Sequence, residues 1–282
     1  MSDPLIDFQG QPAICIQSPE GARATVLLHG GQVVSWIPAS GGEQLYLSPD
    51  ARYGDGQAVR GGIPVIFPQF EQRGPDRSLP RHGFARLQNW EVESVRTGRE
   101  HAQVTMVLRD NAQTRAIWPH GFQLELTVAV SGHQLDLELY IENTGQTAWP
   151  FAAALHTYLG LKSLPHARME GLMGHHFQDN VHGQDGLEDN PEKRFAGEID
   201  RIYAQVTTLR LRDGARVLDI GSDNLPDAVI WNPGPAKCEA LADMPDEDWE
   251  HMLCVEAARI NAPKTLAPGE SWVGRQSILL NA

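Results

Sequence analysis

The sequence FQLELTVAVSGHQLDLELYIE at residues 122–142 alternates between apolar and polar side chains on both sides of a glycine. A period of two places successive side chains on opposite faces of a β-strand, so each run has one apolar and one polar face. Two such runs joined by a short turn at Gly132 predict a long antiparallel hairpin with one face in the core. The apolar positions are Phe122, Leu124, Leu126, Val128 and Val130, followed by Leu135, Leu137, Leu139 and Ile141.

Shorter runs of the same kind occur throughout the chain. They lie at residues 13–17, 23–28, 33–37, 104–108, 206–211, 217–220 and 277–280. No stretch has a sustained 3.6-residue apolar repeat, and the best helix candidate is a short one after Pro245. With 27 glycines and 19 prolines, this pattern predicts an all-β fold, a sandwich or a barrel. No linker-like change of composition occurs, so we expect one domain over residues 1–282.

Composition excludes several classes of protein. The net charge of −13 argues against a nucleic-acid partner, because phosphate backbones need a basic surface. The three cysteines form no close pair, which is typical of a reducing compartment rather than a disulfide framework. The N-terminus lacks the basic and apolar regions of a signal peptide, and the apolar runs are far shorter than the ~20 residues of a membrane span. We therefore expect a cytoplasmic protein without a membrane partner.

Residues 58–70, AVRGGIPVIFPQF, form an apolar segment that cannot be an ordinary central strand. Pro64 and Pro68 each remove a backbone donor that a sheet ladder needs. One interpretation is a segment that places Arg60 and Gln69 at the edge of the core. The other is a buried connection with Arg60 in solvent.

Residues 81–86, RHGFAR, gather basic side chains in a chain that has few of them. If this segment is extended, His82, Phe84 and Arg86 project on one side. A histidine and an arginine on one face can bind an anion or a sugar. The alternative is a surface or capping histidine.

The segment 149–160, WPFAAALHTYLG, places a histidine after an apolar run. In an extended strand, Ala152, Ala154, His156 and Tyr158 share one face, and the alanines leave room above it. Partial desolvation lowers the pKa of His156 toward or below neutrality, which suits a proton donor and acceptor. A satisfied core histidine is the competing interpretation.

The segment 252–257, MLCVEA, ends an apolar run on Glu256. Glutamate is seldom buried without a partner, and an apolar environment raises its pKa and makes the carboxylate a better base. Asp200, in GEIDRIYA at 197–204, is a weaker candidate because neighbouring Asp and Arg are often plain surface charges.

Residues 175–193 are polar and rich in turn formers, which predicts a long loop near the mouth of a site. The loop contains His175, His176 and His182, but neither HExxH nor a cysteine pair accompanies them, so we expect no metal site. The chain also lacks the GxxxxGK[ST], GxGxxG and GxSxG motifs of nucleotide-binding proteins and serine hydrolases.

Six segments occur in the order found in one known family. They are RGGIPVIFPQF (60–70), RHGFAR (81–86), HTYLG (156–160), EIDRIY (198–203), VIWNPGPAK (229–237) and LADMPDEDWEHMLCVEAA (241–258). Together they resemble the aldose 1-epimerase superfamily, specifically its hexose-6-phosphate mutarotase (glucose-6-phosphate 1-epimerase) branch. The resemblance implies a large antiparallel β-sandwich, the galactose mutarotase-like supersandwich, with no metal and no organic cofactor.

The resemblance also implies roles for individual residues and a phosphosugar substrate. Glu256 matches the catalytic base and His156 the catalytic acid. The matches for substrate binding are His82 and Asp200 for the sugar hydroxyls and ring oxygen, Arg60 and Arg86 for the phosphate, and Gln69 for the pocket lining. Two positions depart from the pattern, Glu71 where glycine is common and Gly234 where an aromatic residue is common. Both bear on substrate preference.

Three other functions remain open from the sequence. A non-catalytic carbohydrate-binding protein needs hydroxyl partners but no paired acid and base. A free-aldose mutarotase needs the pair but no phosphate site. A glycoside hydrolase would use Asp200 and Glu256 as its two carboxylates.

Overall fold

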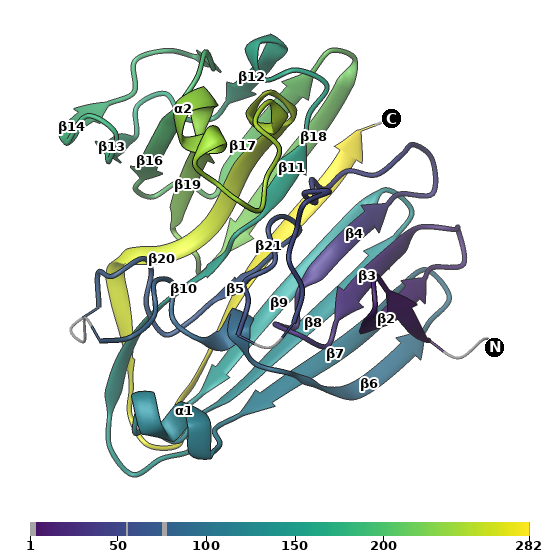
Figure 1. Ribbon diagram of the computed structural model, residues 1–282, viewed down its shortest axis with the longest axis vertical. Helices are drawn as coiled ribbons and strands as arrows, with labels where there is room; N and C mark the ends of the chain where they lie inside the picture. Colours follow the sequence, from purple (N-terminus) through teal and green to yellow (C-terminus); the bar gives the residue numbers. More distant parts are fainter. Residues whose placement is uncertain (1–3, 55, 75–77, 282) are drawn as a thin grey trace.

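The computed structural model describes residues 4–54, 56–74 and 78–281, and within them the chain forms three antiparallel sheets (Figure 1). The nine-stranded sheet has the order β15 (Glu192–Arg194), β12 (Ala167–Glu170), β17 (Thr208–Asp213), β18 (Arg216–Asp223), β21 (Ser271–Asn281), β9 (Gln134–Glu142), β8 (Gln123–Ser131), β7 (Ala102–Arg109) and β6 (Glu91–Thr97).

Two further sheets complete the fold. The eight-stranded sheet has the order β14 (Gln184–Leu187), β13 (His176–Asp179), β16 (Ile199–Tyr203), β19 (Asp227–Asn232), β20 (Met252–Leu266), β10 (Trp149–Leu155) and β5 (Val65–Ile66), and β11 (Tyr158–Gly160) also pairs with β20. The four-stranded sheet consists of β1 (Leu5–Phe8), β2 (Gln11–Gln17), β3 (Arg23–Leu27) and β4 (Val33–Ile37).

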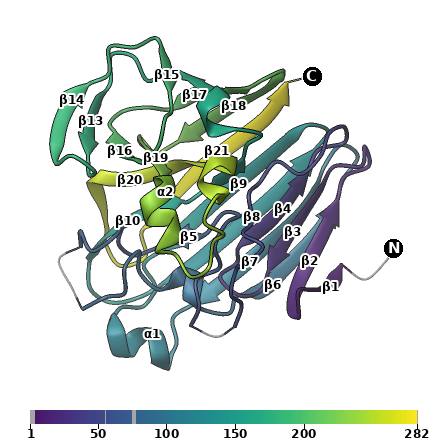
Figure 2. The ribbon, with the colours of Figure 1, turned by 45° about the horizontal axis from the view of Figure 1, so that its top comes forward.

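The two smaller sheets cover different parts of the nine-stranded sheet. β2 and β3 contact β7 and β8, whereas β20 contacts β21. Figure 2 shows the four-stranded sheet alongside the β6–β8 end of the large sheet. A continuous apolar core contains residues of all three sheets, among them Val26, Leu126 and Val255. The predicted β-sandwich is confirmed.

The hairpin predicted at residues 122–142 is formed by β8 and β9. Leu126 pairs with Leu139 and Val128 with Leu137, and all four side chains lie in the core. Burying each such side chain stabilises the fold by roughly 1.5–3 kcal/mol. The alternation therefore fixes which face of the nine-stranded sheet is turned inward.

The segment 81–86 is not extended, so the condition under which His82, Phe84 and Arg86 would project on one side is not met, although His82 and Arg86 both line one cavity. His82 and Gly83 both have left-handed backbone, with φ of 65° and 68°, and a short 3-10 helix follows at Ala85–Leu87. Phe84 is buried against Phe67, with ring centroids 6.1 Å apart. The turn thus sends neighbouring side chains in different directions.

The structure also differs from the predictions for residues 175–193 and for the helices. Residues 175–193 form strands β13 and β14 and most of β15 rather than one loop, because β13 and β14 pair as a hairpin at the edge of the eight-stranded sheet. The helix expected after Pro245 is a 3-10 helix at Asp248–His251. Two short helices were not predicted, α1 (Ala112–Ile117), which begins with a capping box from Asn111, and α2 (Gly234–Glu239).

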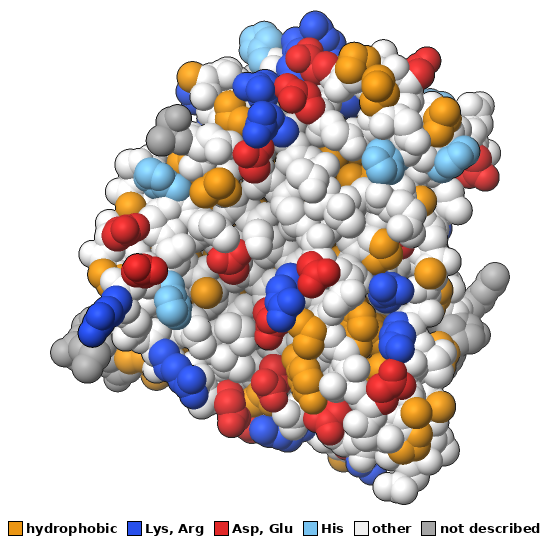
Figure 3. Space-filling view, turned by 180° about the vertical axis from the view of Figure 1, so that it is seen from behind, with side chains coloured by type: hydrophobic (Ala, Val, Ile, Leu, Met, Phe, Trp, Pro, Cys, Tyr) orange, Lys and Arg blue, Asp and Glu red, His pale blue; other side chains and the backbone are white. Residues whose placement is uncertain are grey.

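No helix in the described part of the chain is long and apolar enough to cross a membrane. On the face shown in Figure 3, basic and acidic side chains lie interspersed.

The turn at Gly83 gives a test of backbone constraint. A Cβ at this position would meet the carbonyl oxygen of Phe67, and φ is left-handed. Gly83→Ala should lower the free energy of unfolding by more than about 2 kcal/mol. The matched control is Gly221→Ala in β18, where a Cβ meets nothing within 4 Å. It should change stability by no more than about 1 kcal/mol. Urea unfolding measures both, and equal effects would contradict the constraint.

Candidate active site

A cavity of about 360 Å³ lies on the face of the eight-stranded sheet that is turned away from the main core. Its floor is formed by side chains of β19, β20 and the β10–β11 connection. Six of the seven predicted site residues line it: Arg60, His82, Arg86, His156, Asp200 and Glu256. The topology therefore gathers side chains from five separate stretches of sequence.

His156 and Glu256 lie side by side on the floor. Leu155 pairs with Ala257 between β10 and β20, which brings the two neighbouring residues together. His156 Nε2 and Glu256 Oε1 are 3.3 Å apart, and both side chains are buried. At this distance the two groups can exchange a proton.

Burial dominates the protonation of this pair. It lowers the pKa of His156 well below its usual value, and the positive charges of Arg86 and Arg60 lower it further. Burial also raises the pKa of Glu256 well above its usual value. Each residue is therefore driven toward its neutral form, so the pair together holds one proton.

Two atoms of this pair have no hydrogen-bond partner in the described residues, His156 Nδ1 and Glu256 Oε2. Buried polar atoms are seldom left unpaired, because the lost interaction with water is costly. Glu256 therefore keeps an acceptor oxygen for a bound molecule.

His82 has a defined tautomer. Its Nδ1 accepts the backbone N–H of Glu71 at 3.3 Å, so the ring proton lies on Nε2. The ring stands edge-on to Phe70 and to His156, with centroids 4.9 Å and 5.7 Å away. Burial, with the nearby His156 and Arg86, lowers the pKa of His82, which keeps the imidazole neutral. His82 is a neutral donor.

Two arginines on the cavity wall differ in their partners. Arg60 Nε and Nη2 donate to Asp243 at 3.3 Å and 3.2 Å, and Nη1 donates to Tyr158 Oη at 3.3 Å. Arg86 Nη2 donates to Arg81 O at 3.1 Å, and burial lowers the pKa of Arg86 to about 10. Within the described residues Arg86 makes no ion pair, and its buried Nε is unpaired. Arg86 is therefore a protonated group that has no ion-pair partner among the described residues.

Asp200 lies where the cavity meets the edge strands of the sheet. Its Oδ1 accepts a hydrogen bond from Asn180 Nδ2 at 2.8 Å, and burial raises its pKa. Asn180 Oδ1 in turn accepts from Arg73 Nη2 at 2.8 Å. Asp200 thus belongs to a polar network at the rim.

Glu71 joins the same network, although glycine is common at this position in the family it resembles. Its φ of 50° is left-handed, which explains why glycine suits the position. The carboxylate pairs with Arg73 at 3.2 Å and Arg81 at 2.9 Å. Glu71 therefore holds Arg81 at the rim.

Gly234 is the second position that departs from the pattern of the family. A Cβ at this position would lie 2.6 Å from Glu198 N, which excludes a larger residue.

Gln69 does not line the cavity. Its Nε2 donates to Leu79 O at 3.3 Å and to Pro80 O at 3.1 Å, and the side chain is buried. The amide thus anchors the backbone that leads into Arg81.

The lining residues that sequence reasoning did not single out include Trp231, Lys237 and Asp243. Trp231 and Val229 are two residues apart in β19 and share its outer face. If one of them is known to line the cavity, strand alternation predicts that the other does too. Asp243 belongs to the motif 241–258, but its local sequence carries no sign of a pair with Arg60. Nothing local distinguishes Lys237 from a surface lysine.

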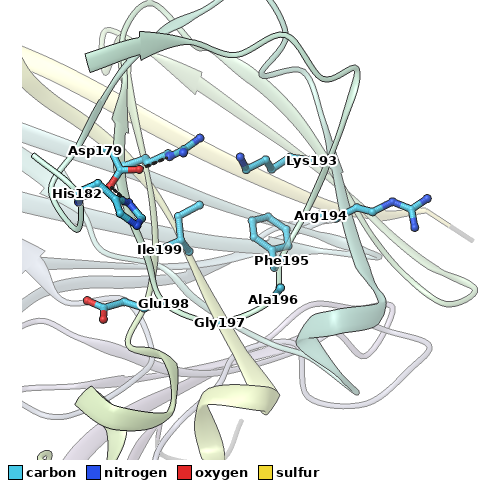
Figure 4. Close-up of a pocket in the computed structure, with 10 residues that line it drawn as sticks. Asp179, His182, Lys193, Arg194, Phe195, Ala196, Gly197, Glu198 and Ile199 are labelled. Atoms are coloured by element: carbon cyan, nitrogen blue, oxygen red, sulfur yellow. Dashed lines mark hydrogen bonds and ion pairs between the residues drawn. The ribbon is translucent and has the colours of Figure 1, made fainter. Parts of the chain in front are cut away.

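A second cavity of about 140 Å³ lies between β13, β16 and the segment 193–198 (Figure 4). Several of its charged groups already have partners. Asp179 pairs with His182 at 3.2 Å and with Arg201 at 2.9 Å, and Lys193 pairs with Glu188, which lies outside the lining, at 3.0 Å. It offers a ligand no free charge among these groups.

The histidines of segment 175–193 do not point toward a common site. His175 Nδ1 bonds to Ala204 O, and His182 bonds to Asp179. Among the described residues, no group of three or more His, Cys, Asp or Glu side chains is arranged to hold a metal ion.

Comparison with known proteins agrees with this architecture. Residues 12–279 match the family model of aldose 1-epimerase. A proposed glucose-6-phosphate 1-epimerase of Cenchrus ciliaris is 34% identical over 279 residues, covering 94% of this chain and 84% of the relative. A proposed enzyme of the same name from Escherichia coli K12 is 32% identical, covering 87% and 82%.

Solved structures give the same result. The crystal structure of a proposed mutarotase from Salmonella typhimurium superimposes with a TM-score of 0.91 at 27% identity, covering 99% of this chain and 95% of that one. A galactose mutarotase related enzyme from Lactobacillus acidophilus has a TM-score of 0.78 at 16% identity, covering 96% and 97%, and shares the fold. The chain belongs to the aldose 1-epimerase family.

Proposed function

We propose that this protein is an isomerase that interconverts the α and β anomers of hexose 6-phosphates, with glucose 6-phosphate as its substrate. One observation carries the proposal. A buried acid–base pair, His156 and Glu256, lies 3.3 Å apart in a cavity whose wall holds Arg86, which forms no ion pair with the other described residues. The names of the relatives from Cenchrus ciliaris and Escherichia coli support this substrate.

The proposed chemistry is proton transfer at both ends of one bond. Glu256, as carboxylate, takes the proton of the anomeric hydroxyl, while His156, as imidazolium, protonates the ring oxygen. The C1–O5 bond opens to an aldehyde, and rotation about C1–C2 presents the other face of the carbonyl. Ring closure returns both protons by the reverse transfers. Each positioned group contributes roughly 10²–10⁴-fold to the rate.

The single proton of the pair must be on His156 for the forward step. In the free protein, the charges of Arg86 and Arg60 disfavour imidazolium. A bound phosphate offsets these charges, so it raises the pKa of His156. Binding of the phosphate thus makes the imidazolium form of His156 less unfavourable than it is in the free protein.

The remaining residues bind and orient the sugar in this proposal. The arginines hold the phosphate through charge-assisted hydrogen bonds, with Arg86 the stronger contributor because Arg60 already binds Asp243. His82 Nε2–H donates to the ring oxygen or a hydroxyl, and the Asp200 carboxylate accepts from a hydroxyl. Holding the far end of the sugar orients C1 between the acid and the base.

Glu256→Gln tests the base. The amide has nearly the same size but cannot take the proton, so the rate of anomerisation should fall by far more than tenfold while the fold survives. Polarimetry on freshly dissolved α-glucose 6-phosphate measures this rate. Glu138→Gln, on the outer face of β9, is the matched control and should be unchanged. A Glu256→Gln rate above about a tenth of wild type, or ~1.4 kcal/mol of barrier, would exclude Glu256 as the base.

The phosphate site is tested by a ratio. Arg86→Ala should lower kcat/KM for glucose 6-phosphate by roughly 10- to 100-fold and leave the slow turnover of free glucose nearly unchanged. Arg60→Ala should act in the same direction but less strongly, because Asp243 already occupies part of its charge. Equal losses for both substrates would mean that the arginines maintain the fold. No loss for either would favour a free-aldose mutarotase.

The pH dependence follows from the same charges. Because the arginines lower the pKa values of the acid–base pair and bound phosphate offsets them, both limbs of the kcat profile should lie at higher pH for glucose 6-phosphate than for free glucose. Initial rates across pH 5 to about 9, corrected for the uncatalysed reaction, give the two profiles. Superimposable profiles would contradict this electrostatic coupling.

A further inference from the structure

A polar side chain crosses the interior of the sandwich directly beneath the acid–base pair. Gln276 lies in the middle of β21, in register with Leu137 of β9, and is only 1% exposed. It faces inward from the nine-stranded sheet, whereas the pair belongs to the eight-stranded sheet. The mechanism proposed above makes no use of it.

Thr157 stands at a break in the eight-stranded sheet. It follows His156, and these two residues separate β10 from β11. Its side chain is fully buried, its N–H donates to Leu155 O at 3.0 Å, and its carbonyl oxygen accepts from Val255 N–H at 2.9 Å. The backbone that carries His156 is therefore not held by a continuous strand.

Gln276 connects this break to the strand that carries Glu256. Thr157 Oγ1 donates to Gln276 Oε1 at 2.6 Å, and Gln276 Nε2 donates to Val255 O at 3.1 Å. One amide thus binds the residue after His156 and the residue before Glu256. Both the oxygen and the nitrogen of the Gln276 side-chain amide form hydrogen bonds, and both partner residues are buried.

Stability alone is a poor explanation for this bridge. A hydroxyl and an amide that are buried together lose their interactions with water, and apolar groups of the same shape are nearly as good for the fold. A fully satisfied network instead fixes one arrangement of the groups that it joins. Here the groups joined are the backbone neighbours of the acid and the base.

We propose that Thr157 and Gln276 act as a positioning unit that fixes the separation of His156 from Glu256 in the productive geometry. This inference rests on the proposed function of that pair. Neither residue touches the cavity, so both act through their neighbours. Displacement of a reacting group by about 1 Å can reduce a rate on the order of 100-fold.

The test compares Thr157→Val, which keeps the shape and removes the hydroxyl, with Thr157→Ser, which keeps the hydroxyl. For Thr157→Val we expect kcat for glucose 6-phosphate to fall by about tenfold or more, with KM within about twofold of wild type. Thr157→Ser should retain most of kcat. Gln276→Met should reproduce the loss, and the double variant should be no worse than either single one, because the two residues act together.

The matched control is Thr105→Val. Thr105 Oγ1 and Thr127 Oγ1 form a cross-strand hydroxyl pair 3.0 Å apart within the nine-stranded sheet. Thr105→Val should leave kcat unchanged. Thermal unfolding of every variant identifies any loss of folded protein, and Gln276→Met decides the question by the same criterion if Thr157→Val does not fold.

Several results would overturn the inference. These are a kcat for Thr157→Val or Gln276→Met within about twofold of wild type, equal losses for Thr157→Val and Thr157→Ser, or a loss confined to KM. A wild-type protein that does not accelerate anomerisation would overturn both this inference and the proposed function. An active wild type with insensitive variants would overturn the positioning role alone.

Discussion

The pairing of β10 with β20 determines where the chemistry of this molecule is located. Leu155 and Ala257 are 102 residues apart in sequence and directly opposite each other in the sheet. A shift of one residue in this register would turn the side chain of Glu256 from the cavity to the core, because alternate residues face opposite sides. The register is in turn secured by the apolar inner face, where Leu155 and Val255 are buried. The same core packing that stabilises the sandwich therefore sets the distance between His156 and Glu256.

The cavity gathers basic side chains although the chain as a whole is acidic. The chain carries a net charge of −13, yet four basic side chains, Arg60, Arg81, Arg86 and Lys237, line one cavity. Asp243, Glu71 and Glu198 pair with Arg60, Arg81 and Lys237. Pairing limits the local repulsion among the cations and leaves Arg86 to act on the buried pair. The electrostatics of the site thus depend as much on the acidic partners as on the arginines.

Much of this could be predicted from the sequence, and the failures have physical causes. Period-two alternation predicted β8 and β9 because one face of each is buried. Apolar runs that end in a lone histidine or glutamate pointed to His156 and Glu256, because such groups are rarely buried without purpose. The extended conformation expected at 81–86 was wrong, since two consecutive left-handed residues redirect the chain and only one of them is glycine.

Other features depend on contacts between distant segments, which local sequence does not encode. Residues 176–187 form the hairpin of β13 and β14, which extends the eight-stranded sheet beyond β16, so their polar composition reflects exposure in strands and not a loop. Gln69 sits in the motif expected to line the pocket, but it bonds to the backbone of a neighbouring loop. The roles of the cavity residues stay predictions until the variants are measured.

The rim and the floor of the cavity have separate origins in the chain. The floor comes from paired strands whose register the core enforces, whereas Glu71 and Arg81 come from a connecting segment that docks on β13 through Arg73. Insertions and substitutions are tolerated far more readily in such a segment than in a buried strand. Substitutions in this segment can therefore change the charge at the mouth of the cavity while the register that holds His156 beside Glu256 stays intact.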